Sequence, residues 1–144
     1  MAIFNPTREQ VREFFILTWQ KYQQKQSLSG MEKIAVGWIL QHPEYHEILE
    51  SSESRSKDYE VAEGQTNPFL HLSMHIAIEE QVSIDSPPGI RKVFEHLSAR
   101  TNEHEAHHEI MECLGQVIWQ SQRNRTPLDH QLYIELLQQR INTH

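Results

Sequence analysis

Several features are scarce or missing in this sequence, and each absence excludes a class of protein. The 144 residues include one cysteine, Cys113, so no intramolecular disulfide can form, and a lone thiol is typical of a reducing compartment. The opening residues, MAIFNPTREQ, lack the basic start and apolar stretch of a signal peptide. No run of about 18 apolar residues follows. We therefore expect a cytoplasmic protein without a membrane partner.

Basic residues are also in short supply. The chain has 13 Lys and Arg against 20 Asp and Glu, which gives a formal net charge of −7, and its basic residues form no run. This charge disfavours nucleic acid and anionic membranes as partners. The glycine-rich phosphate motifs and the G-x-S-x-G nucleophile motif are missing as well. The expected partner is a small molecule or a protein, and the composition does not specify which.

Strand-like alternation is missing, whereas apolar residues recur at helical spacing. Helices are expected over residues 5–25, 29–49, 67–84, 90–99, 102–123 and from 126 onward, with a polar loop over residues 51–65. The length is that of one domain. We predict an all-α fold, a single helical-bundle domain spanning residues 1–144, with four main helices and one or two short ones.

Local signals define where these helices begin. Ser29-x-x-Glu32 and Asn102-x-x-Glu105 have the spacing of capping boxes, and Asn67 precedes Pro68 at a first helical position. Thr126 and Pro127 predict the start of the last helix in the same way. Pro43 interrupts the second helix, which is expected to kink or restart there with His42 as an N-cap.

The chain is organised around residues 67–80, NPFLHLSMHIAIEE. At about 100° per residue, His71, His75 and Glu79 share one arc of a helix that is apolar around most of its circumference. Ser73 and Glu80 lie on the opposite side, so the arc should face the protein interior. Burying ionisable groups costs roughly several kcal/mol of folding free energy unless hydrogen bonds or a metal ion satisfy them.

The same spacing, His-x3-His-x3-Glu, occurs three times, although chance placement gives about 0.08 such triplets. The three sets are His42, His46 and Glu50; His71, His75 and Glu79; and His104, His108 and Glu112. Eight helical residues rise about 12 Å, so a metal site needs ligands from more than one helix. Facing helices with imidazole and carboxylate ligands are typical of iron, manganese or zinc sites.

We therefore predict a protein that binds a divalent transition metal, mononuclear or dinuclear, in a helical bundle. The pattern is compatible with a metal-dependent enzyme and specifies no reaction. The predicted inner ligands are His46, His71, His75 and His108, completed by His42, His104 and Glu112. Either Glu79 or Glu50 is expected to act as a bridging metal ligand, as a base, or as a hydrogen-bond partner of another ligand.

Three alternatives stay open. The first is a metal-free interaction or scaffold protein, in which the His and Glu residues form a buried hydrogen-bond network. The second concerns His107, which lies on the apolar side of its helix and competes with His108 as a ligand. The third is a zincin-like peptidase, since residues 104–108 match H-E-x-x-H. The absence of a strand and of a third downstream His disfavours it.

Three stretches carry a resemblance to a known family: NPFLHLSMHIAIEEQVSIDSPPGIR, ILQHPEYH and HHEIMECLG. Together they include five of the six triplet histidines, and His104 lies just outside them. On these stretches the chain resembles a family of small bacterial proteins known as domain of unknown function 1841, over almost its whole length. The resemblance implies a bacterial cytoplasmic protein and no reaction. A looser similarity to hemerythrin-like bundles rests on the His-x3-His pairs alone.

Overall fold

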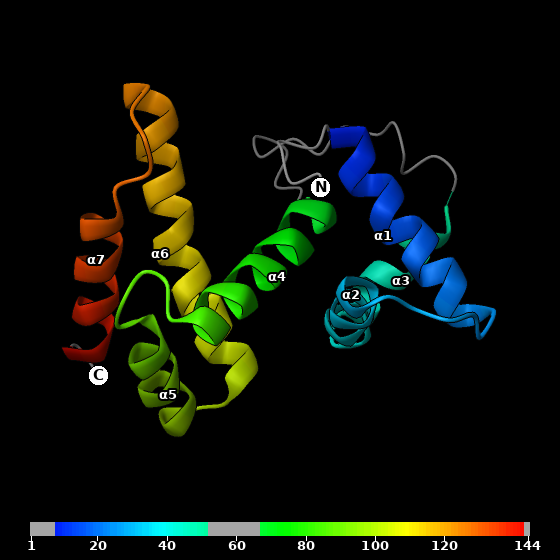
Figure 1. Cartoon of the computed structure of the whole chain (residues 1–144), viewed down its shortest axis with the longest axis horizontal. Helices are drawn as coiled ribbons and strands as arrows, with labels where there is room; N and C mark the ends of the chain where they lie inside the picture. Colours follow the sequence, from blue (N-terminus) through cyan, green and yellow to red (C-terminus); the bar gives the residue numbers. More distant parts are fainter. Residues whose placement is uncertain (1–7, 52–66, 143–144) are drawn as a thin grey trace. The chain divides into compact units, whose positions relative to one another are not determined.

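The structure is a computed structural model that describes residues 8–51 and 67–142. Its elements are α1 (Arg8–Gln23), α2 (Gly30–Leu40), the 3-10 helix η1 (Pro43–Tyr45), α3 (His46–Glu50), α4 (Pro68–Ile84), α5 (Ile90–Arg100), α6 (Glu103–Asn124) and α7 (His130–Asn142) (Figure 1). No strand occurs within these two ranges, so the predicted all-α fold is confirmed. Residues 52–65 of the predicted loop, and the predicted helix start at residues 5–7, lie outside the described ranges.

The chain divides into two compact units, and the division falls inside α4. Unit 1 comprises Met1–Ile76 and unit 2 comprises Ala77–His144. Each unit is described by itself. That residues 1–144 behave as one domain stays a prediction.

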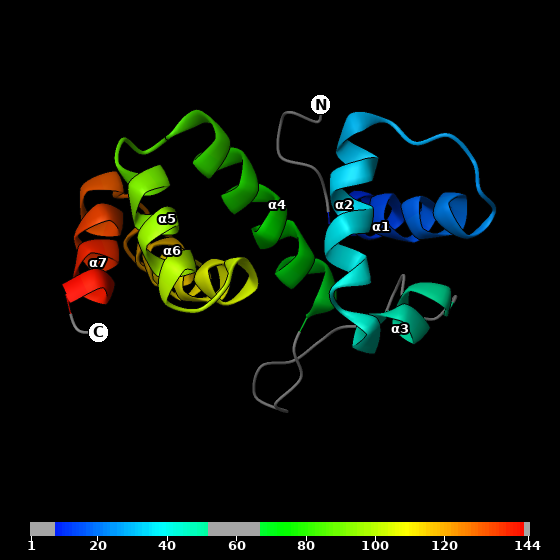
Figure 2. The ribbon, with the colours of Figure 1, turned by 90° about the horizontal axis from the view of Figure 1, so that it is seen from below.

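Unit 1 is built on α1, against which both α2 and α3 pack (Figure 2). Its core combines aromatic and aliphatic side chains from α1, α2, η1, α3 and the first turns of α4. The buried members are Phe15, Ile16, Trp19, Ala35, Trp38, Ile39, Tyr45, Leu49, Phe69 and Leu72. This core holds the first turns of α4, and therefore their histidines, beside the end of α2.

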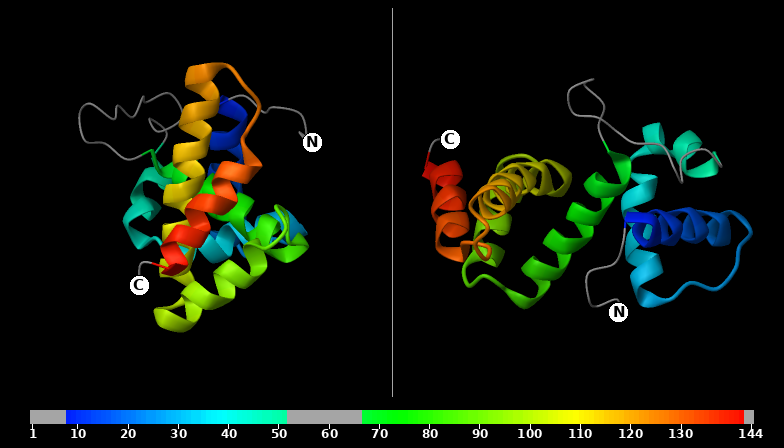
Figure 3. Two further views of the ribbon diagram at one scale, coloured as in Figure 1. Left: turned by 90° about the vertical axis from the view of Figure 1, so that its left-hand side faces the viewer. Right: turned by 90° about the horizontal axis from the view of Figure 1, so that it is seen from above.

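Unit 2 is a three-helix arrangement in which α5, α6 and α7 all contact one another (Figure 3). Its buried side chains are mostly aliphatic: Ile78, Ile90, Val93, Leu97, Ala106, Ile110, Cys113, Leu114, Val117, Tyr133 and Leu137. Arg100, in the last turn of α5, donates to the carbonyl oxygens of Arg140 and Ile141, at 3.2 Å each. This contact ties α5 to the C-terminal turn of α7.

The helix starts follow the predicted caps. Ser29 and Glu32 form both bonds of a capping box at the start of α2. The side chain of Asn67 accepts from the amides of Phe69 and Leu70, at 3.0 and 3.1 Å. Asn102 accepts from the amide of Glu105 at 2.8 Å. These three predictions are confirmed because each cap depends on residues within one turn.

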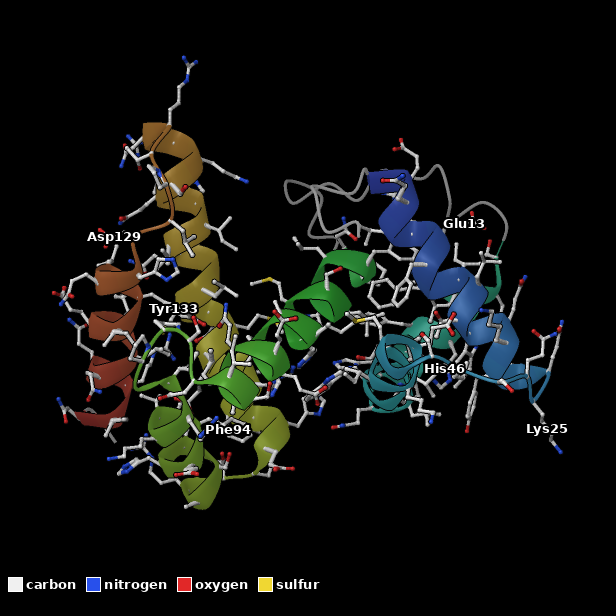
Figure 4. All side chains as sticks on the ribbon, viewed as in Figure 1. Glu13, Lys25, His46, Phe94, Asp129 and Tyr133 are labelled. Atoms are coloured by element: carbon white, nitrogen blue, oxygen red, sulfur yellow. The ribbon has the colours of Figure 1, made fainter. Side chains whose placement is uncertain are left out.

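The predicted start of the last helix at Thr126 is wrong. The amide of Thr126 donates to the Ser121 carbonyl at 3.1 Å, so it belongs to the C-terminal cap of α6. Arg125, in the left-handed conformation with φ of 55°, makes that cap possible. Asp129, labelled in Figure 4, then accepts from the amide of Leu132 at 3.0 Å, and α7 begins at His130.

Among the helices of the described ranges, none is both long and apolar enough to cross a bilayer. The most apolar of the longer helices, α4, has 17 residues. A spanning helix needs about 20 apolar residues. The longest helix, α6, has 22 residues but carries charged side chains along its length.

Candidate metal site

Pro43 places the first histidine of the site. A residue before proline is disfavoured in the helical conformation, so α2 ends at Leu40 and His42 adopts φ of −128° and ψ of 66° as the N-cap of η1. Of the kink or restart expected at Pro43, the structure shows the restart. His42 is buried, and its Nδ1 lies 2.7 Å from the carbonyl oxygen of Trp38. Only a protonated nitrogen can donate to that oxygen, so in the neutral ring it is Nε2 of His42 that carries the lone pair.

The second and third histidines are neighbours on α4. His71 and His75 are one turn apart, and their Nε2 atoms are separated by 3.2 Å. Two ligand nitrogens, each about 2.0–2.1 Å from a tetrahedral metal ion, lie about 3.3 Å apart, so the observed distance suits a shared ion. It also suits a hydrogen bond between the two rings. His75 is fully buried and His71 is half-buried.

The three imidazoles form a nearly equilateral group. The ring centroid of His42 lies 4.9 Å from that of His71 and 4.9 Å from that of His75, and the centroids of His71 and His75 are 4.8 Å apart. One ligand nitrogen from each ring falls within 4.8 Å of the others. The rings are therefore geometrically able to hold one metal ion. We call His42, His71 and His75 the imidazole group.

Aromatic side chains enclose the imidazole group. Trp38 stacks on His75, with ring centroids 4.1 Å apart and 13° between the planes. Tyr45 stacks on His42 at 5.3 Å and meets His71 edge-on at 5.9 Å. Burial, with a smaller contribution from Glu44, raises the pKa of the Tyr45 hydroxyl. Sequence reasoning missed both aromatic residues as part of the site.

The other members of the first triplet have different partners. His46, labelled in Figure 4, stacks on Trp19 at 4.4 Å, and its Nε2 donates to the carbonyl oxygen of Ile39 at 2.9 Å. Glu50 accepts from the indole nitrogen of Trp19 at 3.0 Å and from Gln23 at 3.1 Å. These contacts fix α3 against α1. Of this triplet, the structure brings His42, and not His46 or Glu50, to the imidazole group.

The third triplet lies on α6, in unit 2. The rings of His104 and His108 are 4.4 Å apart, and Nδ1 of His108 is 3.8 Å from Glu105. Glu112 forms an ion pair with Arg140 at 2.7 Å. That His104, His108 and Glu112 bind metal stays a prediction from the sequence.

Glu79 and His107 complete the set of sequence candidates. Glu79 follows His75 by one turn of α4 and is half-buried, and its ligand role stays a prediction. His107 is buried and meets the ring of Phe94 edge-on at 5.4 Å. Burial, with smaller contributions from the charges of His104 and His108, lowers the pKa of His107 to about 4. His107 is therefore neutral at physiological pH.

Taken together, the fold and the site define an all-α protein with a candidate metal centre made of imidazoles. The family model described as Domain of unknown function (DUF1841) matches residues 7–139, and the chain belongs to this family. No curated protein and no solved structure gives a significant match. The family description assigns no activity, so any proposal about function depends on the site itself.

Proposed function

We propose that this protein binds one divalent transition metal ion, with His42, His71 and His75 as ligands. The observation that carries the proposal is the convergence of three ligand nitrogens within 4.8 Å of one another, from two separate segments of the chain. His42 also has the arrangement typical of a metal-binding imidazole, in which the second nitrogen donates to a backbone carbonyl oxygen. That bond fixes the ring and directs Nε2 toward a ligand.

The chemistry of the three ligands favours zinc or iron. Imidazole nitrogen suits zinc, iron, copper and nickel, whereas manganese prefers oxygen ligands. Manganese, which the sequence pattern left open, thus becomes the least favoured of iron, manganese and zinc. Three protein ligands leave a position for water or another ligand, as in catalytic zinc sites.

Further ligands from the sequence prediction are retained as proposals. These are Glu79, His104, His108 and Glu112. Each is tested by measuring the metal content of the Ala variant. A drop in bound metal for His108→Ala with a correctly folded protein supports His108 as a ligand, and full occupancy removes it from the set.

A metal-free scaffold is the second candidate, and one observation favours it. The 3.2 Å separation of the His71 and His75 nitrogens is also the length of a hydrogen bond, so the rings can share a proton instead of an ion. In that case the imidazole group is a buried polar network that fixes α4 against the end of α2.

Metal analysis separates the two candidates. Protein purified without a His tag or chelator should contain close to one equivalent of zinc or iron by ICP-MS. Less than about a tenth of an equivalent, with no uptake on adding zinc or iron(II), supports the scaffold. EDTA gives a second readout, because metal at about 100 times its dissociation constant adds about 2.7 kcal/mol to the free energy of unfolding. The melting temperature of the metal-binding protein should therefore fall on chelation.

A further inference from the structure

We infer that the metal ion held by the imidazole group takes a small anion as its next ligand. This inference rests on the proposed function and adds the chemical class of the ligand. The class is an anionic oxygen or nitrogen donor, such as hydroxide from water or the carboxylate of a small molecule.

The three ligands of the imidazole group carry no negative charge. Three neutral imidazoles leave a divalent ion with its full charge of +2, because histidine binds metal in its neutral form. No carboxylate or thiolate within the described ranges belongs to the group of ligand atoms. The group that accepts from Nδ1 of His42 is also neutral, since it is the carbonyl oxygen of Trp38 and not a carboxylate.

The aromatic rings stacked on the imidazole group screen this charge poorly. His42 and His75 are 3% and 0% exposed, and the side chains stacked on them are the aromatic rings of Tyr45 and Trp38. Charge in such low-polarity surroundings is expensive unless an opposite charge lies close to it. A coordinated anion supplies that charge at the shortest possible distance. The half-buried ring of His71 marks the side of the group that solutes can reach.

Binding of the metal and of the anion should therefore be coupled. Each ligand must raise the affinity of the other by the same factor, which for coupled sites is commonly about 5-fold to 150-fold. Cobalt(II) is a suitable probe because its visible absorption reports changes in coordination. Sodium azide and sodium acetate serve as anions, with perchlorate keeping the ionic strength constant.

The experiment uses the full chain, stripped of metal and titrated with cobalt(II) at fixed pH. Binding of one equivalent tests the proposed function. At saturating azide or acetate, the cobalt affinity should rise by at least about 5-fold, and the visible spectrum should change with one-to-one stoichiometry. A response to azide alone points to a compact anion such as hydroxide, and a response to acetate as well points to a carboxylate.

Two variants with side chains of equal size isolate the charge. His71→Glu introduces a negative ligand, so cobalt binding should become nearly independent of added anion, with an enhancement below about 2-fold. His71→Gln has a side chain of the same shape without the charge, so it should bind cobalt more weakly and keep the anion dependence. Circular dichroism of both variants establishes that they are folded.

The outcomes distinguish the two levels of the proposal. Failure to bind cobalt, zinc or iron(II) overturns the proposed function. One equivalent of bound cobalt whose affinity and spectrum ignore both anions overturns the anion inference and leaves the metal site intact. An anion effect in His71→Glu as large as in the wild type also overturns it, because charge is then not the cause.

Discussion

Three like side chains meet in the imidazole group of unit 1, whereas Tyr133 and Arg140 of unit 2 each pair with a different and complementary side chain. In unit 1 the rings of His42, His71 and His75 lie with centroids 4.8 to 4.9 Å apart. In unit 2 the buried Tyr133 hydroxyl donates to the Gln81 side-chain oxygen at 2.8 Å. Arg140 pairs with Glu112 in the same complementary way.

The imidazole group differs from these two pairs in what can satisfy its polar atoms. A hydroxyl and an amide, or a guanidinium and a carboxylate, satisfy one another by hydrogen bonding and charge. Neutral imidazoles each offer one donor and one acceptor, and three ligand nitrogens that lie within 4.8 Å of one another can share a cation. The Tyr133–Gln81 and Arg140–Glu112 pairs stabilise unit 2, whereas the imidazole group of unit 1 is suited to holding a cation.

The largest expected effect comes from removing the most buried imidazole. His75→Ala should weaken metal binding by roughly 100-fold or more, because one ligand bond and its fixed geometry are lost. The metal-free variant should also lose about 2–4 kcal/mol of unfolding free energy, since the ring of His75 fills space beside Trp38. Isothermal titration calorimetry and urea unfolding measure the two effects.

The matched control for this change is His96→Ala, which removes an exposed imidazole from α5. It should leave metal affinity unchanged and alter the unfolding free energy by less than about 0.5 kcal/mol. Equal metal affinity in His75→Ala and His96→Ala would contradict the role of His75 as a metal ligand.

The second effect concerns acid and unit 2. The pKa of His107 is lowered from 6.5 to about 4 by burial, so the unfolded chain binds a proton at a higher pH than the folded chain. The stability of the metal-free protein should therefore fall as pH decreases from about 6.5 to about 4, by at most ~3 kcal/mol, and level off below that. Urea unfolding in the presence of EDTA at several pH values measures the slope.

Replacing His107 should remove that part of the slope. His107→Leu lacks the titrating group and keeps an apolar side chain against Phe94. The exposed His130→Gln serves as the control and should retain the wild-type pH dependence. If the unfolding free energy of His107→Leu depends on pH as steeply as that of the wild type, His107 is not the group responsible for the acid destabilisation.

The third effect tests a complementary pair. Tyr133, labelled in Figure 4, is fully buried, and Tyr133→Phe removes the donor to Gln81. The unfolding free energy should decrease by about 1 kcal/mol, with no change in metal affinity. Tyr22→Phe, at a side chain that is 40% exposed, should be neutral by comparison. A change in metal affinity for Tyr133→Phe would contradict the expectation that this hydrogen bond contributes to stability alone.

The smallest effect is expected at the ion pair of Glu112 with Arg140. The Glu112 side chain is 64% exposed, so solvent screens the interaction. Glu112→Gln should change the unfolding free energy by no more than about 0.5 kcal/mol. The same variant tests the sequence prediction that Glu112 is a ligand, because a loss of bound metal by ICP-MS supports that role.

The helices of this fold were largely predictable because their signals are local. The caps at Ser29, Asn67 and Asn102 and the break at Pro43 each depend on a few consecutive residues. The start of the last helix was not predictable by the same rule. Thr126 has the sequence of a cap, but the end of α6 uses its amide, and Asp129 begins the helix instead.

The candidate site was predictable in part. His71 and His75 meet because positions one turn apart on an unbroken helix share a face. The same spacing does not place His42 and His46 side by side, because η1 interrupts the helix and His46 stacks on Trp19. The stacking of His75 on Trp38 depends on how α4 packs against α2. These two segments are distant in the sequence, so no local pattern predicted the contact.

X-ray absorption at the zinc or iron edge of the metal-loaded protein identifies the atoms that bind the ion. The account predicts nitrogen neighbours at about 2.0–2.1 Å, with the outer-shell scattering of at least three imidazole rings. In His75→Ala loaded with metal, that imidazole contribution should decrease by one ring. A shell of oxygen alone, or a sulfur neighbour at about 2.3 Å, would contradict a metal site formed by His42, His71 and His75.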